Sequence, residues 1–435
     1  MSHYKPYPVY RDSGVEWIGQ VPEHWRVTPL KVIAETVNGT TPESGKPEYW
    51  DGDIAWYTPT DIDNEVASEL GVPRRYITQA GYESCAVKLS PPGSVILSTR
   101  APIGSVGITT IPSTINQGCR TLIPAQDVPT SYLASTLVAA REELRLRGNG
   151  TTFQELSTEA LRSLRVPMPP RSECVSIASG LDRETARFDA LIAKKTRFIE
   201  LLKEKRQALI THAVTKGLNP KAKMKSSGVE WIGEVPEHWV AIKFNHVARV
   251  TEGLVDPKAH PYREMVLIAP NHIESGTGKI LGLETAVFQN AESGKYTCKK
   301  GAVIYSKIRP ALAKVAIAPC DCLCSADMYP MDCTDRTYPE WLFYLMLSPP
   351  FTSWAILESD RVAMPKINRE SLADLRVFLP PMDEQLAAVA WLKAQVEKLE
   401  IVSLKTQHSI DLLKERRAAF ITAAVTGQID LRESA

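Results

Sequence analysis

The chain has 435 residues, of which 44% are hydrophobic and 23% are charged, and its formal net charge is +1. This length allows two or more domains with their own cores, and the charge neither requires nor excludes a nucleic-acid partner. No apolar run approaches the roughly 18–20 residues of a membrane span, and no apolar signal-peptide region follows the N-terminus, so we expect a cytoplasmic protein.

The N-terminal segment of the chain returns near its middle. Ser13–Trp25 (SGVEWIGQVPEHW) and Ser227–Trp239 (SGVEWIGEVPEHW) agree at twelve of thirteen positions. Two later pairs of segments align at an offset of 211, Leu161–Pro170 with Leu372–Pro381 and Leu201–Thr215 with Leu412–Thr426. A repeat of this length is a duplicated domain rather than a solenoid unit. The halves differ between these matches, which indicates two similar modules that recognise different things.

Each copy of the repeated segment carries two tryptophans, Trp17 and Trp25 in the first and Trp231 and Trp239 in the second. We interpret these side chains as structural anchors at the joints of the scaffold. The second copy directly follows a long helix, whereas the first copy begins the chain. If both halves are built alike, the N-terminal segment lies beside the end of the second long helix, and the chain closes on itself in space.

A region of mixed strand and helix patterns follows each copy. The strand-like runs Gly93–Thr99 and Gly301–Ser306 occupy comparable places, and each precedes a basic turn, at Arg100 and at Lys307-Ile-Arg309. A short helical region comes next, and a Pro-Pro hinge leads into a long helix. This combination predicts the mixed α/β (α+β) fold class.

Two long helices are predicted over about Glu173–Val214 and Glu384–Val425, and no proline interrupts either one. Apolar residues recur at alternating spacings of three and four, as in a coiled-coil seam. Helices related by an internal pseudo-two-fold axis run antiparallel, so we expect an antiparallel coiled coil; a long helix packed only on its own domain is the alternative. The seam positions are Ala178, Leu181, Thr185, Phe188, Ile192, Lys195, Ile199, Leu202, Arg206 and Leu209, and Val389, Leu392, Val396, Leu399, Ser403, Thr406, Ile410, Leu413, Arg417 and Phe420.

The eight cysteines raise the question of a metal site. Cys320, Cys322 and Cys324 alternate along the chain, and Cys333 follows nearby. Zinc sites usually use pairs of cysteines two to four residues apart, whereas alternate buried positions on a strand produce this spacing without a metal. We therefore favour a strand and expect no metal site.

No catalytic motif of a known type is present, because the phosphate-cradling, zinc-hydrolase and nucleophile-elbow patterns are all missing. His24 and His238 are one scaffold position repeated. Ser348-Pro-Pro-Phe351 fits the motif with which amino-methyltransferases hold a flipped base, but the cofactor motif that accompanies it is missing. We therefore interpret this motif as a helix end followed by a turn. A stand-alone DNA amino-methyltransferase and an adhesive coiled-coil protein without nucleic acid remain as alternatives.

The repeated SGVEWIG and PEHW pattern, with an LRVPMPP or LRVFLPP hinge entering each long helix, resembles the specificity subunit of type I restriction–modification systems. Within the first region, Asn38–Pro42, Asp53–Thr58 and Ile115–Gly118 are similar to target-recognition-domain patterns, and Asn271–Gly278 is similar in the second region. The resemblance implies a non-catalytic, sequence-specific DNA-binding subunit. Each target-recognition domain would read one half of an asymmetric bipartite site, and the helices would set the spacer.

The resemblance also implies partners and domain boundaries. Two modification subunits would use S-adenosylmethionine to methylate adenine, and two restriction subunits would use ATP and magnesium; this chain would bind no cofactor itself. The implied parts are an N-terminal scaffold segment (1–25), a first target-recognition domain (26–165), a central long-helix region (166–225), a repeated scaffold segment (226–239), a second target-recognition domain (240–375) and a C-terminal long-helix region (376–435).

Base readout uses arginine or lysine for guanine and asparagine or glutamine for adenine, whereas phosphate contacts position the protein. On this basis we selected polar and basic residues of the two variable regions as candidate DNA contacts. In the first region they are Thr40, Thr41, Tyr57, Thr60, Arg74, Arg75, Arg100, Asn116 and Gln117. In the second they are Lys258, His260, Arg263, Asn271, His272, Lys307, Arg309 and Arg361.

Overall fold

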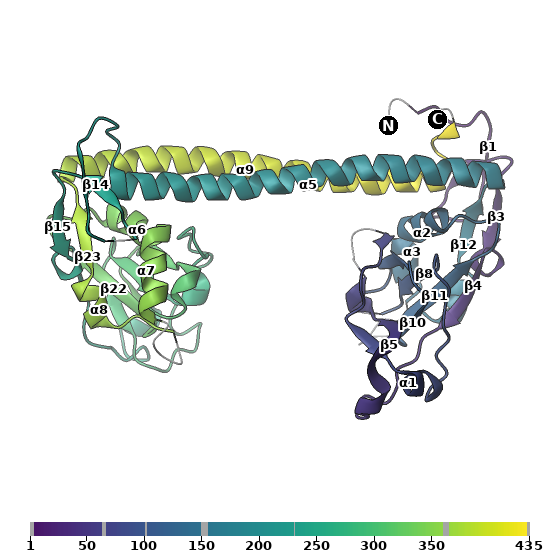
Figure 1. Cartoon of the computed structure of the whole chain (residues 1–435), viewed down its shortest axis with the longest axis horizontal. Helices are drawn as coiled ribbons and strands as arrows, with labels where there is room; N and C mark the ends of the chain where they lie inside the picture. The colour runs from purple at the N-terminus through teal and green to yellow at the C-terminus, as the bar shows by residue number, and fades with distance from the viewer. Residues whose placement is uncertain are drawn as a thin grey trace. The chain divides into compact units, whose positions relative to one another are not determined.

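The computed structural model describes residues 4–62, 67–100, 102–148, 155–229, 231–359 and 365–432. The chain forms two compact units (Figure 1). Unit 1 contains Met1–Thr196 and His408–Ala435, and unit 2 contains Arg197–Gln407. Each long helix therefore contributes one half to each unit. No helix among the described residues is both long and apolar enough to span a lipid bilayer.

Both units combine short strands with helices in a similar but not identical order, which confirms the mixed α/β class. The elements that precede the first long helix are β1 Tyr10–Asp12, β2 Gln20–Pro22, β3 Arg26–Pro29, β4 Ala34–Asn38, β5 Trp50–Tyr57, β6 Ser68–Glu69, β7 Arg75–Ile77, α1 Gln79–Glu83, β8 Val95–Ser98, β9 Val106–Ile108, β10 Ser113–Ile115, β11 Cys119–Pro124, α2 Thr130–Ala139, α3 Arg141–Leu146, α4 Thr158–Arg162 and β12 Arg165–Met168. Those between the long helices are β13 Met224–Ser226, β14 Glu234–Pro236, β15 Val240–Lys243, β16 Ala248–Val250, β17 Leu267–Ile268, β18 Tyr296–Cys298, β19 Val303–Ser306, β20 Val315–Ile317, β21 Cys322–Cys324, β22 Met328–Cys333, α6 Pro339–Leu347, α7 Pro349–Ser359, α8 Arg369–Asp374 and β23 Arg376–Leu379.

The main sheets of the two units share the order of four equivalent strands, and β6 adds a fifth strand in unit 1. Unit 1 has a five-stranded sheet in the order β4-β11-β8-β9-β6, and unit 2 has a four-stranded sheet in the order β16-β22-β19-β20. The central strands β8 (VILS) and β19 (VIYS) are buried at every position, as expected for strands covered on both faces. Helix α2 packs against β8 and β9, and helix α6 packs against β19 and β20. These strands and helices form the core of each unit.

A second, smaller sheet lies in each unit. Strands β5 and β10 of unit 1 pair in parallel, and so do strands β17 and β21 of unit 2. The carboxyl ends of parallel strands lie at one edge of a sheet, so the loops that follow these strands are brought together. That edge contains many of the candidate contacts.

The long helices are α5, Arg171–Lys216, and α9, Met382–Val425, which confirms both predicted helices. In unit 1 the start of α5 (Ile177, Leu181) shares a core with the end of α9 (Phe420). In unit 2 the end of α5 (Ile210) shares a core with the start of α9 (Leu392). The helices are therefore antiparallel within each unit. All the predicted seam positions are buried or half-buried, as a seam requires.

The N-terminal segment lies beside the end of α9, as the repeat predicts, and both chain ends belong to unit 1 (Figure 1). The Tyr10 hydroxyl donates to the Gly427 carbonyl at 2.9 Å, and the Gln428 side-chain amide donates to the Gln20 carbonyl at 2.7 Å. Gly427 has φ +76° and ends the helix in the left-handed conformation that favours glycine. Gly217 has φ +69° and follows α5 in the same way beside Trp239.

Candidate nucleic-acid interface

The repeated segment is attached to the start of each long helix by one carboxylate. In unit 1, His24 Nε2 lies 2.7 Å from Glu173 Oε1, and Trp25 Nε1 donates to Glu173 Oε2 at 2.9 Å. In unit 2, His238 and Trp239 make the same two contacts with Glu384, at 2.6 and 3.0 Å. Glutamate in the first helical turn also interacts favourably with the helix dipole.

These joints confirm the anchoring role of the tryptophans. Trp25 and Trp239 are almost fully buried, and Trp17 and Trp231 pack half-buried against the cores of units 1 and 2. The glutamates were not selected from the sequence. They are related by the same offset of 211 that relates the helices, and this repetition in the sequence could have identified them.

The repeated arginine of the helix seam has different partners in the two units. In unit 2, Arg206 of α5 donates to the carbonyls of Gly276 and Thr277 at 2.7 and 3.1 Å and so fixes the 271–278 loop on the helix. Burial lowers the pKa of Arg206, although nearby Glu400 opposes this effect. The equivalent Arg417 in unit 1 forms an ion pair with Asp189 of α5 at 2.9 Å. Among the described residues, the duplicated position therefore holds a loop in unit 2 and an ion pair between the long helices in unit 1.

The parallel strand pairs end in equivalent loops. Asn116 N–H donates to the Tyr57 carbonyl at 3.0 Å in unit 1, and Ser325 N–H donates to the Ile268 carbonyl at 2.9 Å in unit 2. We call these loops the strand-tip edge. It comprises residues 58–62 and 115–118 in unit 1, and residues 269–273 and 324–327 in unit 2.

Several candidate residues of unit 1 meet at the strand-tip edge. Thr40 N–H donates to the Ile115 carbonyl at 3.0 Å, and the Thr41 hydroxyl donates to Gln117 Oε1. Asn116 Oδ1 accepts from the Gly118 N–H at 2.9 Å, and the half-buried Arg100 side chain lies next to Gly118. A polar group of candidates, Thr40, Thr41, Arg100, Asn116 and Gln117, is thus brought together from three loops.

The other candidates of unit 1 have distinct environments. Thr60 is exposed on the turn after β5, and the Arg74 side chain beside that turn is 71% exposed. The Arg75 guanidinium stacks on the Trp50 ring, 3.6 Å from its centroid. Tyr57 is 1% exposed and donates to the Gly71 carbonyl at 2.8 Å, so the structure assigns it to the core and corrects its selection as a DNA contact.

In unit 2 the candidates form smaller groups. Asn271 and His272 lie on the turn after β17, at the strand-tip edge. Lys307 follows β19 and lies 5.3 Å from the Tyr329 ring centroid, and Arg309 is exposed two residues later. The remaining three described candidates lie on the exposed segment that precedes β17: Lys258, which pairs with Glu292 at 3.3 Å, His260, and Arg263, which pairs with Glu264 at 2.9 Å. Arg361 lies outside the described residues.

The Ser348–Phe351 motif is a junction between helices. The Ser348 hydroxyl donates to the Leu345 carbonyl at 2.6 Å and caps α7 by accepting from the Phe351 N–H at 3.4 Å. Phe351 is fully buried, with its ring centroid 5.6 Å from that of Tyr305. A base-holding aromatic ring must be accessible to a base, so this position does not favour the methyltransferase alternative.

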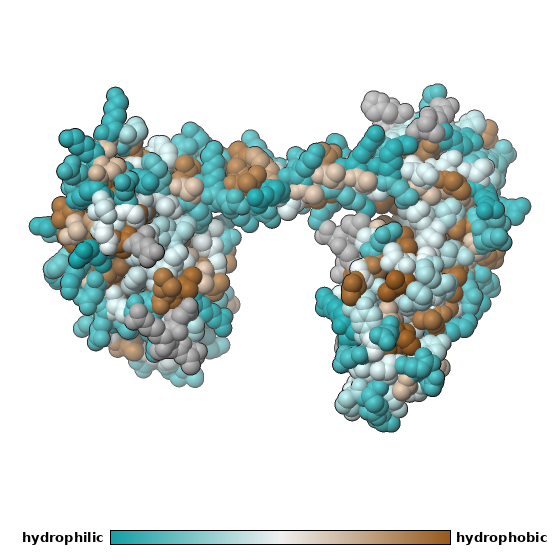
Figure 2. Space-filling model, viewed as in Figure 1, coloured by the Kyte–Doolittle hydropathy of each residue, from teal (hydrophilic) through white to brown (hydrophobic). Residues whose placement is uncertain are grey.

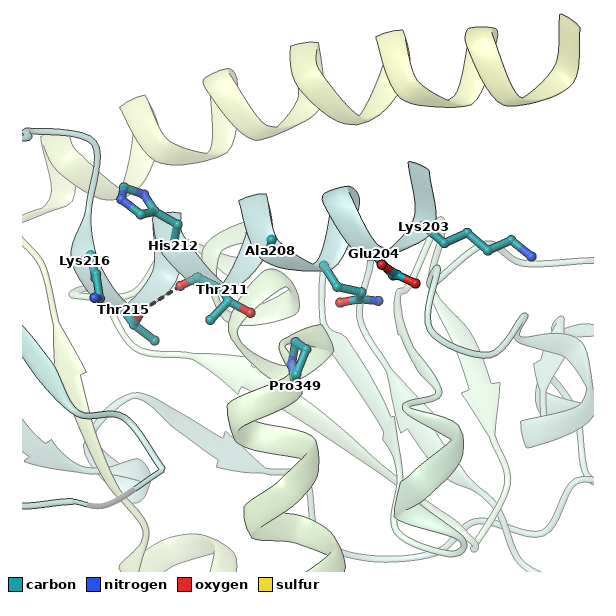
Figure 3. Close-up of a pocket in the computed structure, with 9 residues that line it drawn as sticks. Lys203, Glu204, Ala208, Thr211, His212, Thr215, Lys216 and Pro349 are labelled. Atoms are coloured by element: carbon teal, nitrogen blue, oxygen red, sulfur yellow. Dashed lines mark hydrogen bonds between the residues drawn. The ribbon is translucent and has the colours of Figure 1, made fainter. Parts of the chain in front are cut away.

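An open groove runs along the end of α5 in unit 2 (Figure 3). It is lined by one face of the helix, including Lys203, Glu204 and His212, with Pro349 at the start of α7 opposite Thr211. Figure 3 shows Lys203 and His212 directed away from each other rather than converging on one point. Convergent acid, base and nucleophile groups, which catalysis requires, are not found in this groove.

Two of the three alternating cysteines lie on a strand, as predicted, whereas Cys320 is half-buried in the bend that precedes it. Cys322 and Cys324 are buried on β21, and Cys298 of β18 is directly opposite Cys322. Burial raises the pKa of the Cys333 thiol to about 12, which keeps it in its protonated form. Within the described part of the chain, no three histidine, cysteine, aspartate or glutamate side chains are grouped to hold a metal ion.

Comparison with known proteins agrees with this architecture. The family model for the type I restriction modification DNA specificity domain matches residues 22–201 and 236–412. The specificity subunit of the type I restriction enzyme EcoDI from Escherichia coli is 29% identical over 371 residues, which cover 81% of this chain and 83% of that protein. The MjaIX specificity subunit from Methanocaldococcus jannaschii is 27% identical over 428 residues, which cover 96% of each chain.

Solved structures share the fold. The HsdS subunit from Thermoanaerobacter tengcongensis has a TM-score of 0.51 at 15% identity, covering 94% of this chain and 98% of that chain. A chain from a structure of the complex assembly and conformational transition of a type I R-M system has a TM-score of 0.65 at 16% identity, covering 93% and 98%. With family matches in both halves, the chain belongs to the type I restriction modification DNA specificity domain family.

Proposed function

We propose that the chain is the DNA-binding specificity subunit of a type I restriction–modification complex and acts in the cytoplasm, where the DNA is. Residues 26–165 and 240–375 form its two target-recognition domains, and each reads one half of a bipartite site. The observation that supports this proposal is that both units have the same joints, the same order of four main-sheet strands and the same parallel strand pair, whereas the side chains at their strand-tip edges differ. Two recognition domains with different side chains favour an asymmetric target, because two identical domains would select a palindromic site.

The DNA contacts proposed for the first domain are Thr40, Thr41, Thr60, Arg74, Arg75, Arg100, Asn116 and Gln117. Those proposed for the second are Lys258, His260, Arg263, Asn271, His272, Lys307, Arg309 and Arg361. Exposed basic side chains such as Arg74 suit phosphates, because they carry charge without a fixed orientation toward a base edge. Amides at the strand-tip edge suit bases, because they offer a donor and an acceptor together.

Catalysis belongs to partners in this proposal. Two modification subunits bind S-adenosylmethionine and methylate adenine, and two restriction subunits use ATP and magnesium. Both units offer surfaces for docking, since the mainly hydrophilic surface is interrupted by small apolar groups (Figure 2). In unit 1, Leu191 of α5 is 47% exposed and Leu412 of α9 is 41% exposed; in unit 2, Leu404 of α9 is 71% exposed. Leucines on the outer face of paired helices are typical of helix–helix contacts with another subunit.

The test is a genome-wide map of methyladenine in host cells with the gene, without it, and with the gene restored. We expect one bipartite, asymmetric motif to disappear on deletion and to return on restoration. An unchanged map in cells that express the modification subunits would contradict the proposal. Binding of S-adenosylmethionine by the purified chain alone would instead support the methyltransferase alternative.

A further inference from the structure

Each unit carries a one-turn 3₁₀ helix directly after the first strand of its parallel pair. These helices are η3, Pro59–Asp61, and η6, Pro270–His272. Their sequences with flanking residues, TPTDI and APNHI, share only the proline and the isoleucine. In both, the residue before the proline accepts a backbone hydrogen bond from the third residue of the helix, Asp61 at 3.0 Å and His272 at 2.9 Å.

The equivalence extends to the side chain of the third residue. Asp61 Oδ2 accepts from the Thr58 N–H at 2.8 Å, and His272 Nδ1 accepts from the Ala269 N–H at 3.2 Å. Two different side chains thus close the same turn in the same way. The two turns are therefore one structural position whose exposed residues differ between the units.

Each turn is fixed by hydrogen bonds to neighbouring residues. Asp61 also accepts from the Thr58 hydroxyl at 2.7 Å and from the Arg74 N–H at 3.1 Å, and its side chain is 4% exposed. In unit 2, Lys314 Nζ donates to the Pro270 carbonyl at 2.6 Å. Asp61 is fully engaged and cannot read a base. A turn fixed in this way presents its middle residue in one orientation, which preorganises it for recognition.

We propose that Thr60 and Asn271, at the centres of these turns, determine how the two half-sites differ. This inference rests on the function proposed above. Both side chains are exposed. The Asn271 amide places a donor beside an acceptor, which matches N7 and N6–H₂ of adenine in the major groove. Thr60 offers one hydroxyl, 2.8 Å from the Thr58 hydroxyl, and a methyl group, so its half-site has a different base at the equivalent place.

His272 adds to the second turn. Because Nδ1 accepts from the Ala269 N–H, the proton of the neutral ring resides on Nε2, and that nitrogen is a donor. The second half-site therefore has an adenine opposite Asn271 and, next to it, a base with an acceptor on its major-groove edge. Thymine and guanine supply such acceptors through O4 and through O6 or N7.

The experiment exchanges the central residues in the full-length chain, co-expressed with the modification subunits of its host in cells that lack the natural copy. Methyladenine is mapped genome-wide for the wild type, for Asn271→Thr and for Thr60→Asn. We expect Asn271→Thr to relax discrimination at one base pair of the second half-site by roughly 5- to 150-fold, the range for loss of one bidentate base contact. Thr60→Asn should alter only the first half-site.

Matched controls come from the same units. Asn245→Thr makes the same change at the centre of another 3₁₀ helix of unit 2, η4 (Phe244–His246), and Thr110→Asn changes an exposed residue of unit 1. Both should leave the motif unaltered. An unaltered motif for Asn271→Thr, or methylation that falls equally at all sequences, overturns the inference while the wild-type motif upholds the proposed function. No motif with the wild-type chain overturns the proposed function itself.

Discussion

The two joints provide an internal comparison of one interaction at two degrees of burial. The Glu173 side chain is 9% exposed, and the equivalent Glu384 side chain is 39% exposed. Arg432 also lies 3.4 Å from Glu173 and helps to cover it. Both indoles are almost fully buried, so the joints differ in the position of the acceptor. Glu173→Ala removes the acceptor of the Trp25 indole from a buried position that water cannot readily reach, whereas the position of Glu384 is open to water.

The expected difference can be worked out from this burial. An unsatisfied buried donor costs about 1–3 kcal/mol, whereas a hydrogen bond that water can replace contributes about 0.5–1.5 kcal/mol. We therefore expect Glu173→Ala to destabilise its joint by about 0.5–1.5 kcal/mol more than Glu384→Ala destabilises the other. A difference of 1.4 kcal/mol is about tenfold in an equilibrium constant.

Hydrogen–deuterium exchange followed by mass spectrometry measures each joint separately in the full-length chain. The backbone N–H of Trp25 donates to the Pro22 carbonyl at 2.9 Å, and the backbone N–H of Trp239 donates to the Pro236 carbonyl at 3.0 Å. Protection of these amides reports the free energy of local opening. We expect Glu173→Ala to reduce protection at its joint roughly 2- to 12-fold more than Glu384→Ala does at the other.

Glutamine variants are the matched controls, because glutamine keeps one side-chain acceptor and removes the charge. Their effect should lie between those of the wild type and alanine at each joint. Equal losses at the two joints, or a larger loss for Glu384→Ala, would show that burial of the carboxylate does not determine the strength of the joint.

Two further predictions concern the core and the closure of the chain. Phe351→Ala removes a fully buried ring, a change that costs about 3–5 kcal/mol, so we expect a clear loss of thermal stability in circular dichroism; unchanged stability would show that the ring is not part of the core. Burial raises the pKa of Asp430, but hydrogen bonds from Arg432 outweigh this effect and hold the pKa below its ordinary value. The stabilisation is therefore present above the unfolded pKa of about 3.9 and is lost as the pH falls through the lower folded value. The difference in melting temperature between wild type and Asp430→Asn should shrink from pH 7 to pH 3, and an equal difference at both pH values would refute this.

The sequence by itself determined the duplication, the two long helices and the closure of the chain. Helical periodicity depends on residues three and four apart, so Val389 and Leu392 already indicate the buried face of α9. The repeated Trp25 and Trp239 marked the joints, because a duplicated scaffold preserves its internal contacts. The strand position of Cys322 and Cys324 followed from alternation in the same local way.

Only the tertiary structure decided which side chains meet. Tyr57 is an aromatic residue in a polar motif, yet the pairing of its strand directs its side chain into the core. Arg206 and Arg417 occupy one repeated position, but within the described parts of the chain a loop contacts Arg206, whereas Arg417 pairs with Asp189. Thr60 and Asn271 became equivalent through the hydrogen bonds of β5 with β10 and of β17 with β21, which join residues more than fifty positions apart. Local pattern cannot encode such pairings, because they depend on how distant strands come together.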